Sequence, residues 1–130
     1  MYVYLASYMM REKIGQEAPS PAELWLLRSI VRFKLHEKVF EDQEKLERVL
    51  TNLVKDRFLP FPSERVARPL AIQALQGLER KGFIRVQKGS SVRIEISKKA
   101  REAIKYCEAA RAFVDIDPLL SILDSLSTVK

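Results

Sequence analysis

Residues 69–103, PLAIQALQGLERKGFIRVQKGSSVRIEISKKAREA, contain the clearest signals of secondary structure in the chain. The proline of this stretch suits the first position of a helix, because the missing N–H is not needed there. The residue before a proline is pushed out of the α region, so we expect a break at Arg68. Gly82 then ends the helix directly after two cations, which favour a helix C-terminus. A helix over 69–81 is also predicted by apolar residues at three- and four-residue spacing: Leu70, Ala71, Ala74, Leu75 and Leu78.

Two short runs with period-two alternation follow the glycine, over residues 83–87 and 92–96. Such alternation is typical of strands that bury one face and leave the other in water. The four residues between the runs, Lys88-Gly89-Ser90-Ser91, supply flexible turn chemistry with one positive charge. The sequence therefore predicts an antiparallel hairpin whose outer face carries Arg85, Gln87, Arg93 and Glu95.

This order of elements resembles that of bacterial and archaeal winged helix-turn-helix transcription regulators of the MarR and PadR type. The resemblance is carried by Leu75, the run Leu78-Glu79-Arg80-Lys81-Gly82-Phe83-Ile84, the run Val92-Arg93-Ile94-Glu95-Ile96-Ser97 and the basic helix after it. It implies a mainly α fold with a small β-hairpin: a winged helix-turn-helix domain with extra N- and C-terminal helices. It also implies a regulator that binds double-stranded DNA through a recognition helix (69–81) and a basic wing (84–96).

The chain length predicts a single domain over residues 1–130, because 130 residues with 47% hydrophobic content suffice for one core and not for two. We expect an N-terminal helix within 1–20, a winged-helix core over 21–97 and C-terminal helices over 98–130. The apolar run Tyr2 to Met10 lacks a preceding basic region and is too short to span a bilayer, so neither a signal peptide nor a membrane helix is expected. A cytoplasmic location follows as the default.

The segments before residue 69 are interpreted as the structural scaffold of the domain. A helix that begins at Pro21 is apolar around most of its circumference as far as Leu35, which is typical of a buried helix. Trp25 and Phe40 are interpreted as core or interface residues rather than as platforms for stacked bases. Acidic residues after Phe40 favour the start of a second helix, and residues 64–67 are expected to form a separate short turn before the proline.

Two apolar stripes near the termini contain more hydrophobic side chains than a three-helix core needs. One runs through Leu5 and Met9 near the N-terminus, and the other through Ile104 and Phe113 near the C-terminus. Regulators of the resembling families dimerise through terminal helices, and exposed apolar stripes are costly in water. We therefore expect a homodimer through the terminal helices.

Positive charge is concentrated in one segment. Residues 55–101 hold twelve Lys and Arg against four Asp and Glu, a net charge of +8 in a chain whose total is +6. A basic helix and hairpin favour phosphate as a partner. The alternative is that these charges belong to the solvated, ion-rich surface of a protein from a thermophile. The presence of a single asparagine in the chain also fits such a source.

The candidate DNA contacts come from the helix and the hairpin. Gln73 and Gln76 offer the paired donor and acceptor that complement adenine in the major groove, and Arg80 could contact guanine or phosphate. Cations and a hydroxyl on the wing would hold the DNA backbone or probe the minor groove. The full predicted set is Arg65, Arg68, Gln73, Gln76, Arg80, Lys81, Arg85, Lys88, Ser90 and Arg93.

Catalytic and metal chemistry is not expected, and no cofactor is predicted. His36 is the only histidine, Cys107 is the only cysteine and falls on an apolar stripe, and no glycine-rich phosphate loop is present. The alternative to DNA binding is a winged-helix module that binds other proteins in a replication, transcription or membrane-remodelling assembly. Such a module would not need a concentrated cationic tip, which favours duplex DNA.

Overall fold

The computed structural model describes the backbone of residues 2–116 and the side chains through residue 112. In this range the fold is mainly helical, with one antiparallel hairpin, as the sequence predicted at this coarse level. The elements are α1 (Tyr2–Ile14), α2 (Pro21–Arg32), α3 (Gln43–Leu53), α4 (Glu64–Arg80), β1 (Ile84–Lys88), β2 (Val92–Ile96) and α5 (Lys98–Ile116). Short 3-10 turns at Gly15–Glu17 and Leu35–Glu37 and a π-helical turn at Val54–Phe58 join them.

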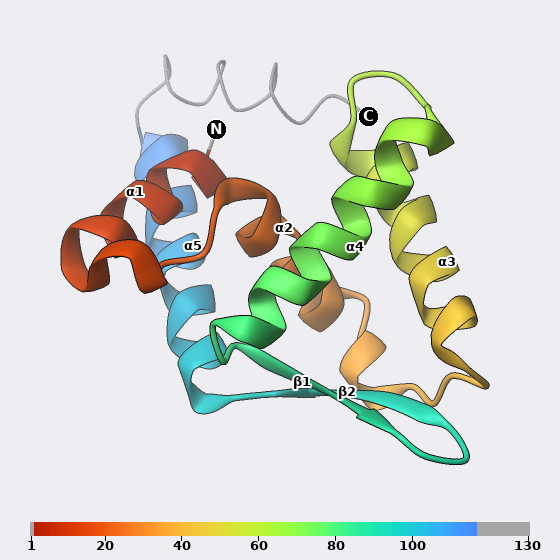
Figure 1. The fold of residues 1–130 in the computed structure, drawn as a ribbon. Coiled ribbons are helices and arrows are strands. Elements are labelled where there is room, and N and C mark those ends of the chain that lie inside the picture. Colours follow the sequence, from red (N-terminus) through yellow and green to blue (C-terminus); the bar gives the residue numbers. More distant parts are fainter. Residues whose placement is uncertain (1, 117–130) are drawn as a thin grey trace.

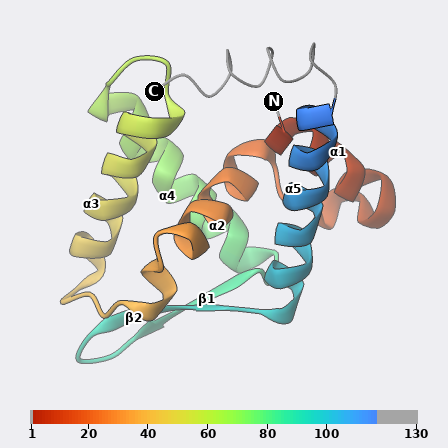
Figure 2. The same ribbon diagram turned by 180° about the vertical axis from the view of Figure 1, so that it is seen from behind.

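Helix α2 lies at the centre and contacts α1, α4 and α5. It therefore joins the pair of helices α1 and α5 to α4. Helix α4 crosses the front of the molecule in Figure 1, with α3 packed along its first half. The hairpin runs below them, and α1 and α5 lie together on the side away from α3. Seen from behind, α2 and α5 lie in front of α4 (Figure 2). The molecule thus has one face built on α4 and an opposite face built on α2 and α5.

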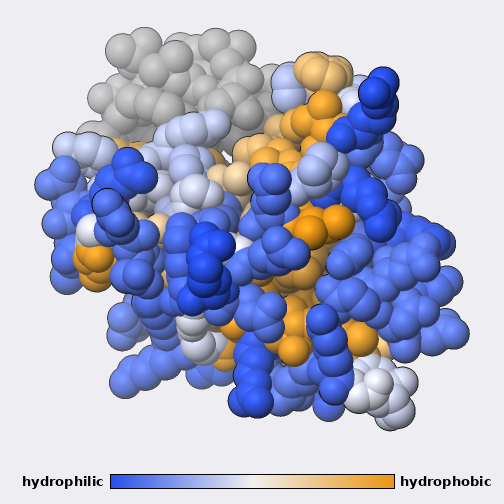
Figure 3. Space-filling view, in the orientation of Figure 1, coloured by the Kyte–Doolittle hydropathy of each residue, from blue (hydrophilic) through white to orange (hydrophobic). Residues whose placement is uncertain are grey.

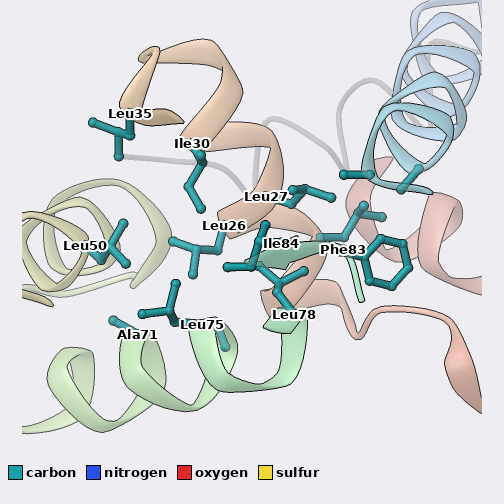
Figure 4. Close-up of a cluster of buried hydrophobic side chains, with 14 of the residues drawn as sticks. Leu26, Leu27, Ile30, Leu35, Leu50, Ala71, Leu75, Leu78, Phe83 and Ile84 are labelled. Carbon is teal, nitrogen blue, oxygen red and sulfur yellow. The ribbon is translucent and has the colours of Figure 1, made fainter. Parts of the chain in front are cut away.

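The core forms where α2, α4 and the hairpin meet (Figure 4). Leu26 and Ile30 of α2 are fully buried against side chains of α4 that include Leu75 and Leu78. Apolar residues on most sides of α2 predicted this burial, because such a helix must be covered from several directions. Phe83, the residue that leads into β1, is also fully buried and closes the core at the base of the hairpin.

The hairpin pairs Ile84 with Ile96 and Val86 with Ile94, so its apolar residues share the inner face as predicted. A third segment joins its edge: the backbone N–H of Phe40 donates to the carbonyl of Val92 at 2.8 Å, and Val92 returns the bond at 2.8 Å. The chain between α2 and α3 is therefore fixed to the hairpin, although it forms only an isolated bridge.

The predicted break before Pro69 is wrong, because α4 begins at Glu64 and passes through the proline without interruption. Pro69 lacks the N–H that would bond to the carbonyl of Arg65, and both residues lie on the exposed side of the helix, where water can reach that carbonyl. Ala67 and Ala71, on either side of the proline, are buried in the core. Their packing outweighs the local preference of the residue before proline.

The described parts of the two terminal stripes, which led to the prediction of a homodimer, find partners within the chain. Helices α1 and α5 pack against each other and against α2. Leu5, Met9 and Ile104 are partly buried there, whereas the Phe113 side chain and residues 117–130 lie outside the described residues. Small side chains on α5 permit the close approach. The buried residues of the two helices are Tyr2, Val3, Ala6 and Met10 with Ala100, Ala103, Cys107 and Ala110.

One carboxylate connects the start of α2 to the end of α4. Glu23 accepts from the backbone N–H of Ser20 at 2.9 Å, while the Ser20 hydroxyl accepts from the Glu23 N–H at 3.2 Å, which completes a capping box. The same carboxylate accepts from the ammonium of Lys81 at 2.7 Å. Glu23 is only 8% exposed and lies against Gly77, where an added Cβ would overlap its carboxylate. Gly77 is therefore needed because any side chain at this position would overlap the Glu23 carboxylate.

Replacing Gly77 by alanine should destabilise the fold. Helix propensity alone would gain about 1 kcal/mol from this change, but displacement of a buried, paired carboxylate costs more. We expect a net loss of about 1–3 kcal/mol in the free energy of unfolding, measured by urea denaturation. Gly89→Ala is the matched control, because a Cβ there meets open space. Equal stability of the two variants would show that the Glu23 contact does not constrain α4.

The Cys107 thiol should be unreactive in the folded protein. Burial raises its pKa from 9.0 to about 12, an effect that the nearby Arg28 only partly opposes. Ellman's reagent should label the native chain far more slowly at pH 8 than the chain in guanidinium. Since the folded thiol has the higher pKa, its contribution to stability is full below pH 9 and is lost as the pH rises towards 12. Labelling of the native chain at the rate of a free thiol would contradict this burial.

Candidate nucleic-acid interface

The exposed side of α4 carries polar side chains near both ends and in the middle, with the exposed Pro69 between them. Gln76 and Arg65, about three turns apart, lie on one line along the helix, and Gln73 and Arg80 lie on the same side of that line. All four residues are exposed, whereas Ala74 and Leu78 on the opposite side are buried. The face of the molecule that carries α4 is mostly hydrophilic, with some hydrophobic side chains in its centre (Figure 3). The predicted exposure of the two glutamines is confirmed.

The outer face of the hairpin is less uniformly cationic than its sequence suggests. Arg85 is directly opposite Glu95 across the two strands, and Glu95 also accepts from the amide Nε2 of Gln87 at 2.6 Å. Glu79, at the end of α4, accepts from the backbone N–H of Val86 at 3.2 Å and adds a second carboxylate near Arg85. The positive charge of Arg85 is therefore partly balanced at the base of the hairpin.

The tip of the hairpin keeps its positive charge. A hollow of about 250 Å³ lies at the tip, lined by Gln87, Lys88, Gly89, Ser90, Ser91 and Arg93. Its lining contains two cations and a hydroxyl group from the predicted set and no acid. Arg93 is opposite the neutral Gln87 across the strands. The tip can therefore offer hydrogen-bond donors to an oxygen-rich anion such as phosphate.

The two arginines near the start of α4 differ in their surroundings. Arg68 lies 3.8 Å from a carboxylate oxygen of Glu47 on α3, and both side chains keep some exposure. Such a pair is weak and is screened by salt, so Arg68 can still exchange partners. Within residues 2–112, Arg65 forms no ion pair, and the same holds for Arg80, Lys88 and Arg93.

Lys81 does not share the surface of the other predicted contacts. Its ammonium is 2.7 Å from Glu23 and donates to the carbonyl of Ala18 at 3.1 Å, with the side chain only 17% exposed. Lys81 lies one residue after Arg80, but this step turns its side chain by about 100° towards α2. It therefore holds the helix in place instead of presenting a free charge.

Lys38 is a cation near the hairpin that the sequence did not single out. It is exposed and lies two residues before Phe40, whose backbone pairs with Val92. No local pattern could reveal this proximity, because it arises from a backbone pairing over 52 positions. The structure thus brings Lys38 towards the strand that carries Arg93.

Residues 2–112 contain no group of three His, Cys, Asp or Glu side chains placed to hold a metal ion. Within the described part of the chain, no helix has both the length and the apolar character that a membrane span requires.

Comparisons with protein-family models, with curated proteins and with solved structures each find no match to this chain.

Proposed function

We propose that this protein is a winged-helix regulator that binds double-stranded DNA, with α4 in the major groove and the hairpin as the wing. The order α2, the paired segment at Phe40, α3, α4, β1 and β2 supports this arrangement. It is also the order that the resemblance to the MarR and PadR type implies. The proposal assigns base reading to α4 and backbone contacts to the wing.

The observation that carries the proposal is the uncovered stripe of α4 with a cation near each end. Arg65 and Arg80 are 15 positions apart, which corresponds to about 22 Å along a helix axis. The major groove is about 12 Å wide, so arginines at that separation can reach phosphates on both sides while the middle of the helix meets the bases. Gln73 and Gln76 occupy that middle section, with the partly buried Ile72 beside them for contact with a thymine methyl group.

The wing would act as a second, sequence-independent grip. Lys88, Ser90 and Arg93 surround the hollow at its tip, and charge-assisted hydrogen bonds to phosphate need such unpaired donors. Arg85, close to two carboxylates, is expected to contribute less than Arg93.

A second candidate function is the binding of another protein, and one observation favours it. Phe61 is 56% exposed in the loop before α4, and Val66 in the first turn of α4 is 44% exposed. Exposed apolar side chains of this kind can contribute to a protein interface. A cationic tip is not needed for that role, which is why DNA binding remains the first proposal.

A homodimer is not part of the proposal, because helices α1 and α5, whose apolar stripes predicted it, pack against each other and against α2 within the chain. One recognition helix would then contact one site, and the wing would supply the additional affinity.

The affinity for duplex DNA should fall steeply as salt is raised. Each neutralised phosphate contributes a slope of about −0.9 to a plot of log affinity against log salt concentration. Fluorescence anisotropy with a random 20-base-pair duplex measures this slope. Arg93→Ala should make it shallower by about one, whereas Arg11→Ala, a matched exposed arginine on α1, should leave it unchanged. Absence of duplex binding at any salt concentration would favour the protein-binding alternative at Phe61 and Val66.

Gln76→Ala should separate base reading from backbone contact. Once a preferred site has been selected from random duplexes, this variant should lose roughly 1–3 kcal/mol on that site and little on random DNA. Arg93→Ala should weaken both to a similar degree. Gln16→Ala is the matched glutamine control, because Gln16 is exposed in the turn after α1. Equal losses on both kinds of DNA for Gln76→Ala would mean that α4 does not read bases.

A further inference from the structure

A second group of arginines lies on the opposite face of the molecule, between α2 and α5. Figure 2 shows these two helices in front when the molecule is viewed from behind. A cleft of about 410 Å³ opens between them, lined by Arg28, Val31, Arg32, Ile104, Glu108 and Arg111. Neither the α4 stripe nor the hairpin contributes to this lining, so the cleft is separate from the proposed DNA surface.

The described lining of the cleft has a net charge of +2, since three guanidinium groups face one carboxylate. The closest approach among these charges is that of Arg28 Nε to Glu108, at 3.9 Å, which is beyond hydrogen-bonding distance. Within residues 2–112, no carboxylate forms a hydrogen bond with Arg28, Arg32 or Arg111. Their N–H donors therefore remain available to a ligand.

Aromatic rings hold these arginines in position. The guanidinium carbons of Arg28 and Arg111 lie 4.9 Å and 5.4 Å from the centre of the Tyr2 ring, so one ring orients two cations. Arg32 is 5.5 Å from the centre of the Phe33 ring. Arg28 and Arg111 also line the cleft, so an anion bound there would be attracted by more than one guanidinium group.

We infer that this α2–α5 cleft binds a phosphate group carried by a ligand. Guanidinium donors approach from two positions on α2 and one on α5, and a tetrahedral phosphate can accept from three directions where a planar carboxylate offers only two oxygens. The charge of +2 also matches a phosphate dianion. Val31 and Ile104 give the cleft an apolar wall against which the remainder of an organic phosphate can pack. The inference does not depend on the proposed function of α4.

Isothermal titration of the full chain with inorganic phosphate tests the cleft, with sodium chloride at matched ionic strength as the blank. Arg32→Ala and Arg111→Ala remove exposed side chains, and each should weaken phosphate binding by roughly tenfold or more. Lys105→Ala, an exposed cation on α5 outside the cleft, should leave the affinity unchanged. Unaltered binding in both cleft variants, or no phosphate binding by the wild-type chain, would overturn the inference.

A second arm identifies the source of the phosphate. A variant with Arg65, Arg80 and Arg93 all replaced by alanine removes the main cations of the α4 and hairpin surface. If this variant still binds duplex DNA, and inorganic phosphate or Arg32→Ala abolishes that binding, then the cleft holds a nucleic-acid backbone. If it binds inorganic phosphate and no duplex, the cleft holds a small phosphorylated molecule. Either result supports phosphate recognition between α2 and α5.

Discussion

The carboxylate of Glu23 is the constraint on which the arrangement of the helices depends. It completes the capping box at the start of α2 and binds the Lys81 ammonium at the end of α4, so a single side chain sets the position of both helix ends. Removing either partner would leave a charge 11–17% exposed and without its counterion, which is costly in a region of low polarity. Because Gly77 makes room for the carboxylate, the orientation of α4 depends on a residue that has no side chain.

The same junction fixes the hairpin and α5. Lys99 donates to the backbone carbonyl of Lys81 at 2.7 Å, and its ammonium lies 4.8 Å from the centre of the Phe83 ring. The hydroxyl of Ser97 donates to the carbonyl of Phe83 at 3.0 Å and accepts from the N–H of Ala100 at 3.1 Å, which caps α5. The end of α4, the base of the hairpin and the start of α5 are thus joined at one place. This joint holds the hairpin at a fixed position relative to the exposed stripe of α4.

The basic residues take three different roles that depend on their neighbours. Arg80 and Lys81 are adjacent in sequence, but the first is exposed and the second is bound to Glu23. Arg28 and Arg111 lie outside residues 55–101, the segment with a net charge of +8, and they meet on the other face around one buried ring. A sum of charges along the chain therefore located one cationic surface and could not detect the other, because the second is built from three separate stretches of sequence.

The sequence by itself determined the elements whose signals are local. Alternation over 84–96 fixed the faces of the hairpin, and the apolar spacing of α4 placed Gln73 and Gln76 in water, because side-chain direction follows directly from strand and helix geometry. Tertiary structure decided the rest. Core packing around Ala67 and Ala71 carried α4 through Pro69 against its local preference, and α1 covered α5 where the sequence suggested a second chain. An apolar helix face is buried by segments that are distant in sequence. A local pattern therefore cannot predict which segment will cover it.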